Sequence, residues 1–263
     1  MKNKITIITI NLNQKKDLEN TINSIISQNY NNLEFIIIDG GSVDGSIEII
    51  NKYSSYITKW ISENDQGIYD AMNKGLNLST GDWINFKNSG DVFFDEKVLN
   101  SIDFDKHNKT DIIYGPSIND YGFIKVNQLK TYNINLNNLY LGRVMPPHQS
   151  TFSRSLLYDN YRFPQEFRIA SDYDFILKMF LAKKNIVFDE VSRTIFHIGG
   201  ISTKNEILTV KEKYKITKRY IDNYIVDINY FILILSVILK SYFKKNKIFY
   251  RIVKKIQING FRK

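Results

Sequence analysis

The chain has 263 residues, of which 43% are apolar, so it is long enough and apolar enough to bury the core of one large α/β domain. It contains no cysteine, which excludes disulfides, thiol catalysis and cysteine-ligated metal sites. The formal net charge of +9 is uneven, because nine Lys and Arg residues and no acid fall between Lys240 and Lys263, while the remainder carries 27 basic and 27 acidic residues. The basic character therefore belongs to a C-terminal tail and not to the fold.

Strand and helix patterns alternate over the first third of the chain. Strands are predicted over Ile5–Ile10, Leu33–Ile38, Ile57–Ile61 and Trp83–Phe86, with helical spacing between them over Leu18–Ile26, Ile47–Ile50 and Tyr69–Leu78. Farther on, the pattern predicts short strands over Ile112–Tyr114, Phe123–Val126 and Gln149–Ser153, a helix over Ser171–Lys183, and only helix from Glu206 onward. The alternation predicts an α/β fold with a mostly parallel, Rossmann-like sheet flanked by helices.

Neither end of the sequence has the pattern of a secretory signal or of a spanning helix. The apolar run Lys4–Asn11 is broken by threonines and has no cleavage-site pattern, so we expect a first strand there. The longest apolar run is Ile228–Leu239, between Asp227 and Lys240, which is shorter than the ~18 apolar residues of a spanning helix. We therefore expect no membrane-spanning segment.

Polar residues stand where the predicted parallel strands end. Thr9 and Asn11 close the first strand, and Asp39, Asp65 and Asp91 follow the second, third and fourth. In open parallel sheets, ligands bind at these carboxyl ends. Asp39 alone would be ordinary turn chemistry. Three acids at three successive strand ends favour a binding site.

The segment after the first strand argues against a dinucleotide-binding protein. Thr9–Asn13 has no glycine, and the chain has no phosphate-binding loop that ends in Gly-Lys-Ser or Gly-Lys-Thr. A nucleotide bound near acids, without a glycine loop, needs another way to neutralise its phosphates. A divalent cation held by a carboxylate is the usual answer, so we predict Mn²⁺ or Mg²⁺ as cofactor.

Several motifs resemble the inverting family 2 glycosyltransferases of the GT-A fold, with the closest likeness to bacterial enzymes of O-antigen, capsule and colanic-acid assembly. The motifs are Ile36–Ser46 (IIIDGGSVDGS), Ser62–Gly75 (SENDQGIYDAMNKG), Gly81–Asp91 (GDWINFKNSGD), Pro146–Phe152, Ala170–Phe175 and Phe196–Ser202. The resemblance covers residues 4 to about 203. It implies a GT-A catalytic domain over residues 1–204, followed by a helical C-terminal region over residues 205–263.

The resemblance also implies roles for single residues. The implied donor-binding residues are Thr9, Asn11, Asp39, Gly41, Ser42, Asp65, Lys74 and Asp91. Asp39 would bind the nucleotide base, and Asp91 would ligate the metal, with His197 as a second ligand. His148 and Gln149 would line the acceptor site, although a structural turn is an open alternative for both. A packed histidine and a solvated lysine are the open alternatives for His197 and Lys74.

Asp172 is the implied general base, which would take the proton of the acceptor hydroxyl. Asp174 lies two residues farther on, and residues two apart on a helix do not share a face. Only one of the two can therefore point at a substrate, and Asp172 matches the position of the family base. The alternative is that both acids only complement the N-terminus of a helix.

The implied function is that of an inverting, metal-dependent hexosyltransferase. It would move a sugar from UDP-hexose or UDP-N-acetylhexosamine to a lipid-linked saccharide in surface-polysaccharide biosynthesis. The chain departs from the family at Gly90, which replaces the first of two acids that usually follow Asn-Ser. Gly90 leaves open a second hypothesis, a weakened or inactive relative that only binds nucleotide sugars or glycans.

The tail has the pattern of a basic amphipathic helix, since Ile248, Phe249, Ile252, Val253 and Ile256 recur at helical spacing among lysines and arginines. Three interpretations are open: attachment to an anionic membrane surface, nucleic-acid binding, and packing on the body. We favour membrane attachment through residues 228–263 and expect no nucleic-acid partner. Similar enzymes act on saccharides carried by a polyprenyl diphosphate, which implies a cytoplasmic location, peripherally attached to the inner face of the plasma membrane.

Overall fold

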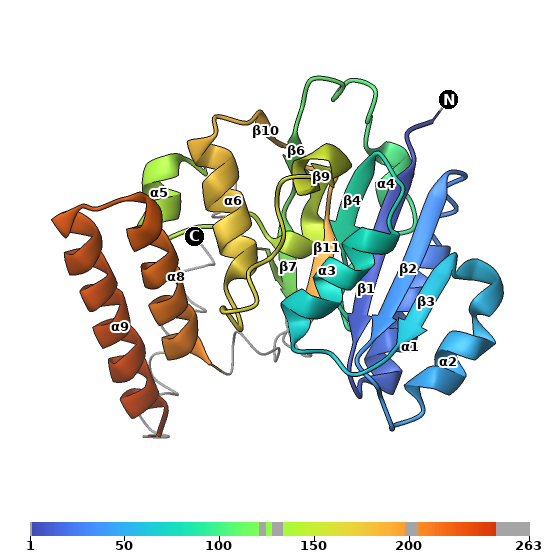
Figure 1. Cartoon of the computed structure of the whole chain (residues 1–263), viewed down its shortest axis with the longest axis horizontal. Coiled ribbons are helices and arrows are strands. Elements are labelled where there is room, and N and C mark those ends of the chain that lie inside the picture. Colours follow the sequence, from blue (N-terminus) through green and yellow to red (C-terminus); the bar gives the residue numbers. More distant parts are fainter. Residues whose placement is uncertain (1, 121–124, 128–133, 198–204, 246–263) are drawn as a thin grey trace.

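The computed structural model describes residues 2–120, 125–127, 134–197 and 205–245, and its centre is a seven-stranded sheet (Figure 1). The strands are β1 (Ile5–Asn11), β2 (Leu33–Asp39), β3 (Lys59–Ser62), β4 (Trp83–Phe86), β6 (Ile112–Tyr114), β9 (Thr151–Arg154) and β10 (Ile186–Phe188). Their order in the sheet is β10-β6-β9-β4-β1-β2-β3, and only β9 runs antiparallel to its neighbours. The predicted mostly parallel α/β sheet is confirmed.

Helices cover both faces of this sheet. One face carries α3 (Ile68–Leu78) and α6 (Ser171–Leu181), and the other carries α1 (Lys15–Ile26), α2 (Ser46–Lys52) and α4 (Val98–Ser101). Successive side chains of a strand point to opposite faces. Ile8 and Ile38 therefore pack with the α3 residues, while Ile7 and Ile37 pack with those of α1. Burial on both faces explains why β1 and β2 are continuous apolar runs.

A second, four-stranded sheet stands beside the first. It consists of β5 (Val92–Phe93), β11 (Thr194–His197), β7 (Ser117–Asp120) and β8 (Lys125–Asn127), in that order. β5 begins directly after Asp91, so the chain passes from one sheet to the other at the residue predicted to bind metal. Of the strand predicted over Phe123–Val126, residues 123 and 124 lie outside the described residues.

The sequence prediction of a strand over Gln149–Ser153 is wrong at its start. His148–Ser150 forms the 3₁₀ helix η3, and β9 begins only at Thr151. The reason is local, because the N–H of Ser150 donates to the carbonyl of Pro147 at 3.1 Å and closes a tight turn. Two other short 3₁₀ segments are η1 (Ser54–Tyr56), which precedes the four-residue strand β3, and η4 (Ser155–Tyr158), which follows β9.

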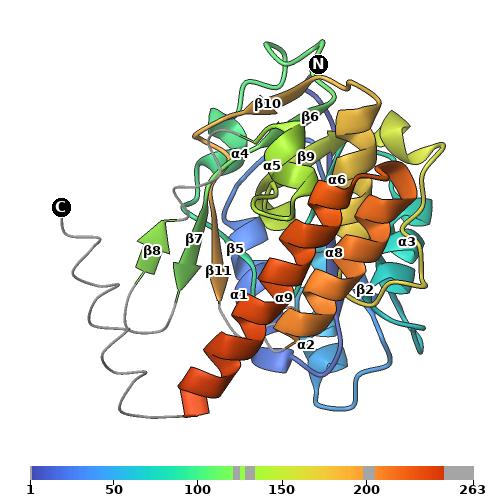
Figure 2. The same cartoon turned by 90° about the vertical axis from the view of Figure 1, so that its left-hand side faces the viewer.

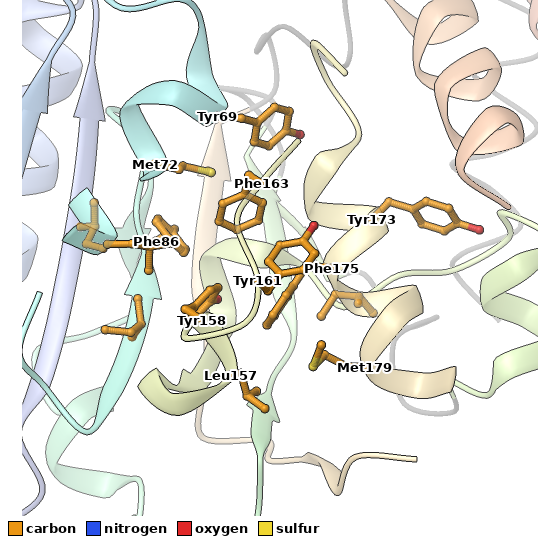
Figure 3. Packing of buried hydrophobic residues seen from close by; sticks show 14 of the residues in the cluster. Tyr69, Met72, Phe86, Leu157, Tyr158, Tyr161, Phe163, Tyr173, Phe175 and Met179 are labelled. Atoms are coloured by element: carbon orange, nitrogen blue, oxygen red, sulfur yellow. The ribbon is translucent and has the colours of Figure 1, made fainter. Parts of the chain in front are cut away.

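Aromatic side chains pack α6 against the main sheet (Figure 3). Phe175 of α6 stacks on Tyr158 with ring centres 4.8 Å apart and contacts Tyr161 at 5.0 Å. Phe163 joins this group to Phe86 of β4 at 5.5 Å in an edge-to-face contact. Each such aromatic pair adds about 0.5–1.5 kcal/mol to its area burial. The cluster therefore fixes the place of α6, and with it the start of the helix that carries Asp172.

The chain ends, within the described residues, in α8 (Glu206–Tyr220) and α9 (Tyr224–Lys245), so the prediction of helix from Glu206 is confirmed there. α8 is anchored by Glu212, whose carboxylate accepts hydrogen bonds from the backbone N–H groups of Arg168, Ile169 and Ala170 at 2.9–3.1 Å. These residues lead directly into α6. α8 is thus packed on the body, and the proposed division between residues 204 and 205 stays a prediction.

α9 runs back along α8 at the outside of the molecule (Figures 1 and 2). Its segment Tyr224–Tyr242 has a mean hydropathy of 1.7 and is long and apolar enough to cross a membrane, by length and composition only. The expectation that no segment reaches this length is therefore wrong by that measure. The basic amphipathic pattern over residues 248–256 lies outside the described residues.

The two sheets are joined by a lysine that is completely buried. Lys87 follows β4, and its ammonium donates hydrogen bonds to the carbonyl of Gln149 at 2.8 Å and to the hydroxyl of Thr194 in β11 at 3.0 Å. The ring of Phe93 in β5 lies 3.8 Å from the same nitrogen. Burial lowers the pKa of Lys87 to about 7, although the nearby Asp91 acts to raise it.

This depressed pKa predicts a specific pH dependence of stability. Between about pH 7 and pH 10.5 the unfolded chain keeps a proton on Lys87 that the folded chain has released, so the free energy of unfolding should rise with pH in this window. The slope from one such group is at most about 1.4 kcal/mol per pH unit. Lys87→Met removes the group, so the free energy of unfolding of the variant, minus that of the wild type, should fall as the pH rises from 7 to 10. Urea denaturation of both proteins at several pH values measures this difference, and a constant difference would contradict the assignment.

Candidate active site

The strand ends of β1, β2 and β3 meet in register around the carboxylate of Asp39. One oxygen of this buried carboxylate accepts from the amide of Asn11 at 2.8 Å and the hydroxyl of Ser42 at 2.6 Å. The other accepts from the backbone N–H groups of Gly41 at 3.1 Å and Ser42 at 2.8 Å and from the hydroxyl of Ser62 at 2.7 Å. Burial acts to raise the pKa of Asp39, but the hydrogen bonds outweigh it and the pKa lies below its ordinary value.

Asp39 therefore shapes the loop after β2, with all its hydrogen-bond partners inside the protein. Gly41 has φ +81°, a left-handed conformation that favours glycine. The positions of Gly41 and Ser42 are fixed by their hydrogen bonds to this carboxylate. The predicted contact of Asp39 with a nucleotide base stays a prediction.

Asn11 carries the network onward to the loop after β4. Its amide oxygen accepts from the hydroxyl of Ser89 at 2.8 Å, which brings the predicted donor-binding strand ends together. Thr9 lies two residues earlier in β1 and is completely buried. Its hydroxyl has no hydrogen-bond partner among the described residues. A buried hydroxyl without a partner is unusual in a folded protein. It is the type of group that a ligand or water satisfies.

Asp65 and Lys74 form an ion pair of 2.7 Å beside this loop. Lys74 also lies 2.9 Å from Glu63 and 3.4 Å from Asp70. Burial acts to lower the pKa of Lys74, but Asp65 and the other carboxylates raise it above its ordinary value. Lys74 is thus surrounded by three acids, and its predicted contact with a donor diphosphate stays a prediction.

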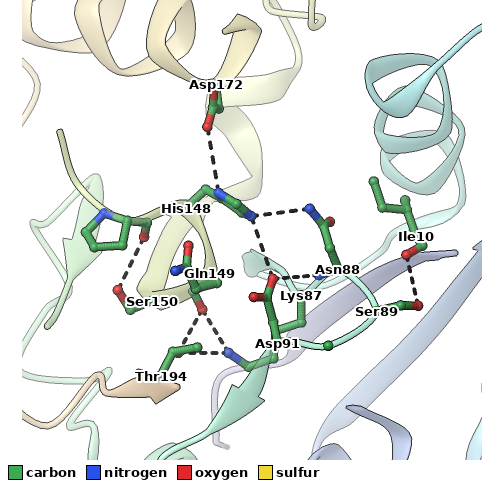
Figure 4. A network of polar contacts seen from close by, with 12 residues as sticks. Ile10, Lys87, Asn88, Ser89, Asp91, His148, Gln149, Ser150, Asp172 and Thr194 are labelled. Atoms are coloured by element: carbon green, nitrogen blue, oxygen red, sulfur yellow. Dashed lines mark hydrogen bonds and ion pairs between the residues drawn. The ribbon is translucent and has the colours of Figure 1, made fainter. Parts of the chain in front are cut away.

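The centre of the site is His148, which lies between two carboxylates (Figure 4). Its Nε2 is 3.7 Å from an oxygen of Asp91, and its Nδ1 is 3.7 Å from an oxygen of Asp172. Asp91 is almost completely buried at the end of the β4 loop, whereas Asp172 stands in the first turn of α6. The structure therefore brings together the predicted metal ligand, the predicted base and a predicted acceptor-site residue, although 57 and 24 residues separate them from His148 along the chain.

Charge decides the protonation of His148. Burial acts to lower its pKa, but the two flanking carboxylates raise it above the ordinary value, and Lys87 opposes them. A protonated imidazole has an N–H on both ring nitrogens, so it can face Asp91 and Asp172 at once. In its protonated form, His148 thus balances the negative charge of the two acids.

The structure separates Asp172 from Asp174 as predicted. Asp172 is partly exposed, and one of its oxygens accepts a hydrogen bond from the hydroxyl of Tyr69 in α3 at 3.1 Å. Asp174 is buried and accepts hydrogen bonds from Tyr161 and Tyr220, both at 2.9 Å. Asp174 is held inside the protein, so Asp172 is the acid that faces the site.

For two further predicted residues, the structure gives no support to the predicted role. The side chain of Gln149 is buried and donates to the hydroxyl of Ser117 at 3.0 Å, so its place gives no support to an acceptor contact. His197 ends β11 opposite Asp120 of β7, but its side chain lies outside what the structure describes. Its role as a second metal ligand stays a prediction.

Sequence reasoning missed three groups that the fold brings to this site: Lys87, Tyr69 and Asn88. Lys87 supplies a buried positive charge near Asp91, and Tyr69 holds Asp172. The amide nitrogen of Asn88 lies 3.4 Å from His148, while its amide oxygen is buried without a partner among the described residues. All three lie inside the matching motifs, and this was the only signal in the sequence that pointed to them.

The residues around Asp91 fit a divalent cation only in part. Within the residues that the structure describes, no group of three His, Cys, Asp or Glu side chains is arranged to hold a metal. Asp91 offers a carboxylate, and the unpartnered oxygen of Asn88 lies close by in sequence. Mg²⁺ is commonly bound by one or two carboxylates plus substrate phosphates, so this donor set suits a cation that arrives with a diphosphate.

Gly90 has a conformational reason to be glycine. Its φ is +99°, which other residues rarely adopt, while a Cβ at this position would meet only Asp17, at 3.7 Å. The turn is closed by the N–H of Asn88, which donates to Asp91 at 3.0 Å. The replacement of the first acid thus goes with a left-handed turn that still presents Asp91.

A cavity of about 260 Å³ opens beside Tyr69, on the side of α3 that faces α8. Polar residues of three segments line it: Gln66, Asp70, Gln165, Arg168 and Asn205. Tyr69 lines the cavity and also donates a hydrogen bond to Asp172, so the cavity lies toward the end of the site that carries Asp172.

Known proteins share the sequence pattern or the fold of this chain. A glycosyltransferase of Mycobacterium bovis named for PGL/p-HBAD biosynthesis is 28% identical over 181 residues, which cover 66% of this chain and 69% of that protein. S. aureus TarS 1–349 in complex with UDP-GlcNAc has a similar structure (TM-score 0.65, 17% identity, 86% of this chain and 70% of that one). So does the mannosyltransferase PcManGT from Pyrobaculum calidifontis in complex with GDP-Man and Mn²⁺ (TM-score 0.65, 13% identity, 84% and 66%). Residues 6–165 match the model of glycosyl transferase family 2, and the chain therefore belongs to that family.

Proposed function

We propose that this chain transfers a sugar from a nucleotide-sugar donor, UDP-hexose or UDP-N-acetylhexosamine, to a hydroxyl of a lipid-linked saccharide. The observation that carries the proposal is the arrangement of Asp91 and Asp172 on the two sides of His148, 3.7 Å from each ring nitrogen. Such a transfer needs negative charge to be stabilised on one side of the reacting carbon and a proton to be removed on the other. The two acids stand at the two ends of such an arrangement.

The donor side is the edge formed by the ends of β1, β2 and β4. Asn11 and Asp39 fix the loops there, and the unpartnered hydroxyl of Thr9 leaves a polar group for a ligand. UDP-GlcNAc is the ligand in the TarS complex, which supports a UDP-sugar as donor here. The resemblance and the fold thus agree on the kind of donor.

Asp91 would hold the divalent cation, Mn²⁺ or Mg²⁺, together with oxygens of the donor diphosphate. When bound, this cation supplies positive charge that stabilises the leaving diphosphate. Mn²⁺ is present in the PcManGT complex, which supports this choice of cofactor. When protonated, the buried Lys87 adds a second positive charge near Asp91.

Asp172 would accept the proton of the acceptor hydroxyl. Tyr69 donates a hydrogen bond to one of its oxygens and leaves the other toward His148. One base and one in-line attack invert the anomeric centre, so an α-linked donor would give a β-linkage. The cavity beside Tyr69 gives the acceptor saccharide room next to Asp172.

The acceptor would be a saccharide on a polyprenyl diphosphate, in the assembly of a surface polysaccharide such as O-antigen. The enzyme would then be peripherally attached to the cytoplasmic face of the plasma membrane. The support is the exposed apolar helix α9 and the basic tail that follows it. No described feature favours nucleic acid as a partner.

Asp91→Asn should remove metal-dependent donor binding. The amide keeps the shape but has no charge to hold a cation, so the gain in UDP affinity on addition of Mn²⁺, measured by calorimetry, should disappear. Hydrolysis of the UDP-sugar should fall by at least about 100-fold, as for the loss of charge stabilisation at other active sites. Asp222→Asn, at a carboxylate that is 91% exposed, is the control and should behave like the wild type. Undiminished stimulation by Mn²⁺ in Asp91→Asn would refute the role.

Asp172→Asn and Asp174→Asn form a matched pair two residues apart. The first should lower the turnover rate by about 10²–10⁴-fold with little change in donor affinity, because it removes the base. The second should lower the free energy of unfolding by about 1–3 kcal/mol, because an amide cannot accept from both Tyr161 and Tyr220 without burying its N–H groups unpaired. Single-turnover kinetics and thermal unfolding of both variants separate the two effects. Equal turnover in the two variants would argue against Asp172 as base.

A further inference from the structure

The outer face of α9 is apolar from Tyr224 to Leu239. The exposed large apolar side chains are Tyr224, Ile225, Ile228, Phe231, Ile232, Leu235, Ile238, Leu239 and Tyr242. Their spacing of three and four residues gathers them on one side of the helix. A surface helix of a soluble protein normally turns charged or polar residues to solvent on that side. An apolar stripe of this length marks a surface that is covered by something.

The opposite face of α9 is held by the body. Tyr230 is buried, and its hydroxyl lies 3.2 Å from those of Tyr173 in α6 and Thr217 in α8. Asp227 accepts a hydrogen bond from Tyr214 of α8 at 2.8 Å, and Asn229 donates to the carbonyl of Leu141 at 2.7 Å. Helix α9 is therefore fixed to α8 and α6 through buried polar contacts, and its exposed apolar side chains lie on the other side of the helix.

These contacts decide between two ways of meeting a membrane. If α9 crossed the bilayer while packed on α8, it would draw the charged side chains of α8, among them Lys211, Lys215 and Arg219, into the hydrocarbon. If α9 crossed alone, the contacts of Tyr230, Asp227 and Asn229 would be lost. A helix that lies in the plane of the membrane keeps these contacts and still covers its apolar face.

Charge identifies the surface that would cover α9. The apolar face leads into the segment from Lys240 to Lys263, which has nine basic residues and no acid. A neighbouring protein with an apolar groove would not require this charge, whereas anionic lipid headgroups attract it. The end of α9 also lies at the same end of the molecule as the carboxyl ends of β1 and β2 (Figure 1).

We propose that α9 lies in the interface of an anionic bilayer, parallel to its plane, with its apolar stripe immersed and its Tyr230 face kept on the body. This inference rests on the proposed attachment to a membrane and specifies its mode. It places α6, the helix that carries the proposed base, in direct contact with the lipid-bound helix α9, through the hydroxyl groups of Tyr173, Thr217 and Tyr230.

Because the chain has no cysteine, each introduced cysteine is the only one that can carry a label. Single variants Ile228→Cys, Phe231→Cys, Leu235→Cys and Leu239→Cys place a nitroxide along the free face, and Val237→Cys is the matched control on the side toward the body. The full-length protein is bound to vesicles of phosphatidylcholine and phosphatidylglycerol (7:3), and the depth of each label is measured from its collision rates with oxygen and a nickel chelate. An in-plane helix gives one shallow depth for all four labels and a clearly lower oxygen collision rate at Val237.

Two profiles would overturn the proposal. A depth that is greatest at the middle labels and small at both ends would show a helix that crosses the bilayer. Labels that are unchanged by vesicles but shielded at high protein concentration would show that a second copy covers the stripe.

A second variant tests the attachment itself. Combined replacement Phe231→Ser, Leu235→Ser and Ile238→Ser should weaken partition to these vesicles at least tenfold, while hydrolysis of a UDP-sugar in solution stays at the wild-type rate. Leu156→Ser, at an apolar side chain that is 56% exposed in η4, beside the start of β4 and not the carboxyl ends of the parallel strands, is the control and should not change partition. Unchanged partition in the triple variant refutes the stripe as the membrane contact. Lack of hydrolysis by the wild type would instead refute the transfer reaction and would leave the vesicle results valid.

Discussion

One backbone carbonyl holds the parts of the active site together. The backbone oxygen of Gln149 accepts hydrogen bonds from Asn85 of β4 at 3.2 Å, from Lys87 at 2.8 Å and from Thr194 of β11 at 3.1 Å. It thereby ties the short turn that begins at His148 to both sheets. Because His148 reaches Asp91 on one side and Asp172 on the other, the spacing of the two acids depends on this buried joint. Buried polar groups that are fully paired in this way specify one arrangement rather than several.

The fold was predictable where burial leaves a direct pattern in the sequence. The apolar run Leu33–Ile38 forms a strand because both of its faces are covered, and Trp83–Phe86 is found with the predicted bounds. That Asp172 and Asp174 face different surroundings also follows from helix geometry, since residues two apart point in different directions, whereas the choice of Asp172 between them came from the resemblance. In each of these cases the decisive interaction is local, and local spacing is what a sequence displays.

The rest depends on partners that are far away in the sequence. Lys87 looks like a solvated lysine, and only its contacts with Gln149 and Thr194, the latter 107 residues away, show that it is buried. The apolar segment of α9 was underestimated for the same reason. Asp227 ends it in the sequence, yet in the fold Asp227 accepts a hydrogen bond from Tyr214 of α8, so the exposed apolar face has no charged residue before Lys240. Hydropathy along the chain cannot separate two faces whose difference is created by tertiary contacts.

The C-terminal helices also take part in placing Asp172, the proposed base. Glu212 of α8 accepts hydrogen bonds from the backbone that leads into α6, and Tyr220 of α8 binds Asp174 within its first turn. Tyr230 of α9 reaches Tyr173, the direct neighbour of Asp172. The start of α6 is thus fixed from the sheet side by aromatic packing and from the other side by α8 and α9. A surface that binds α9 would therefore orient the base with the body, as one rigid unit, and no hinge is needed between the attachment and the chemistry.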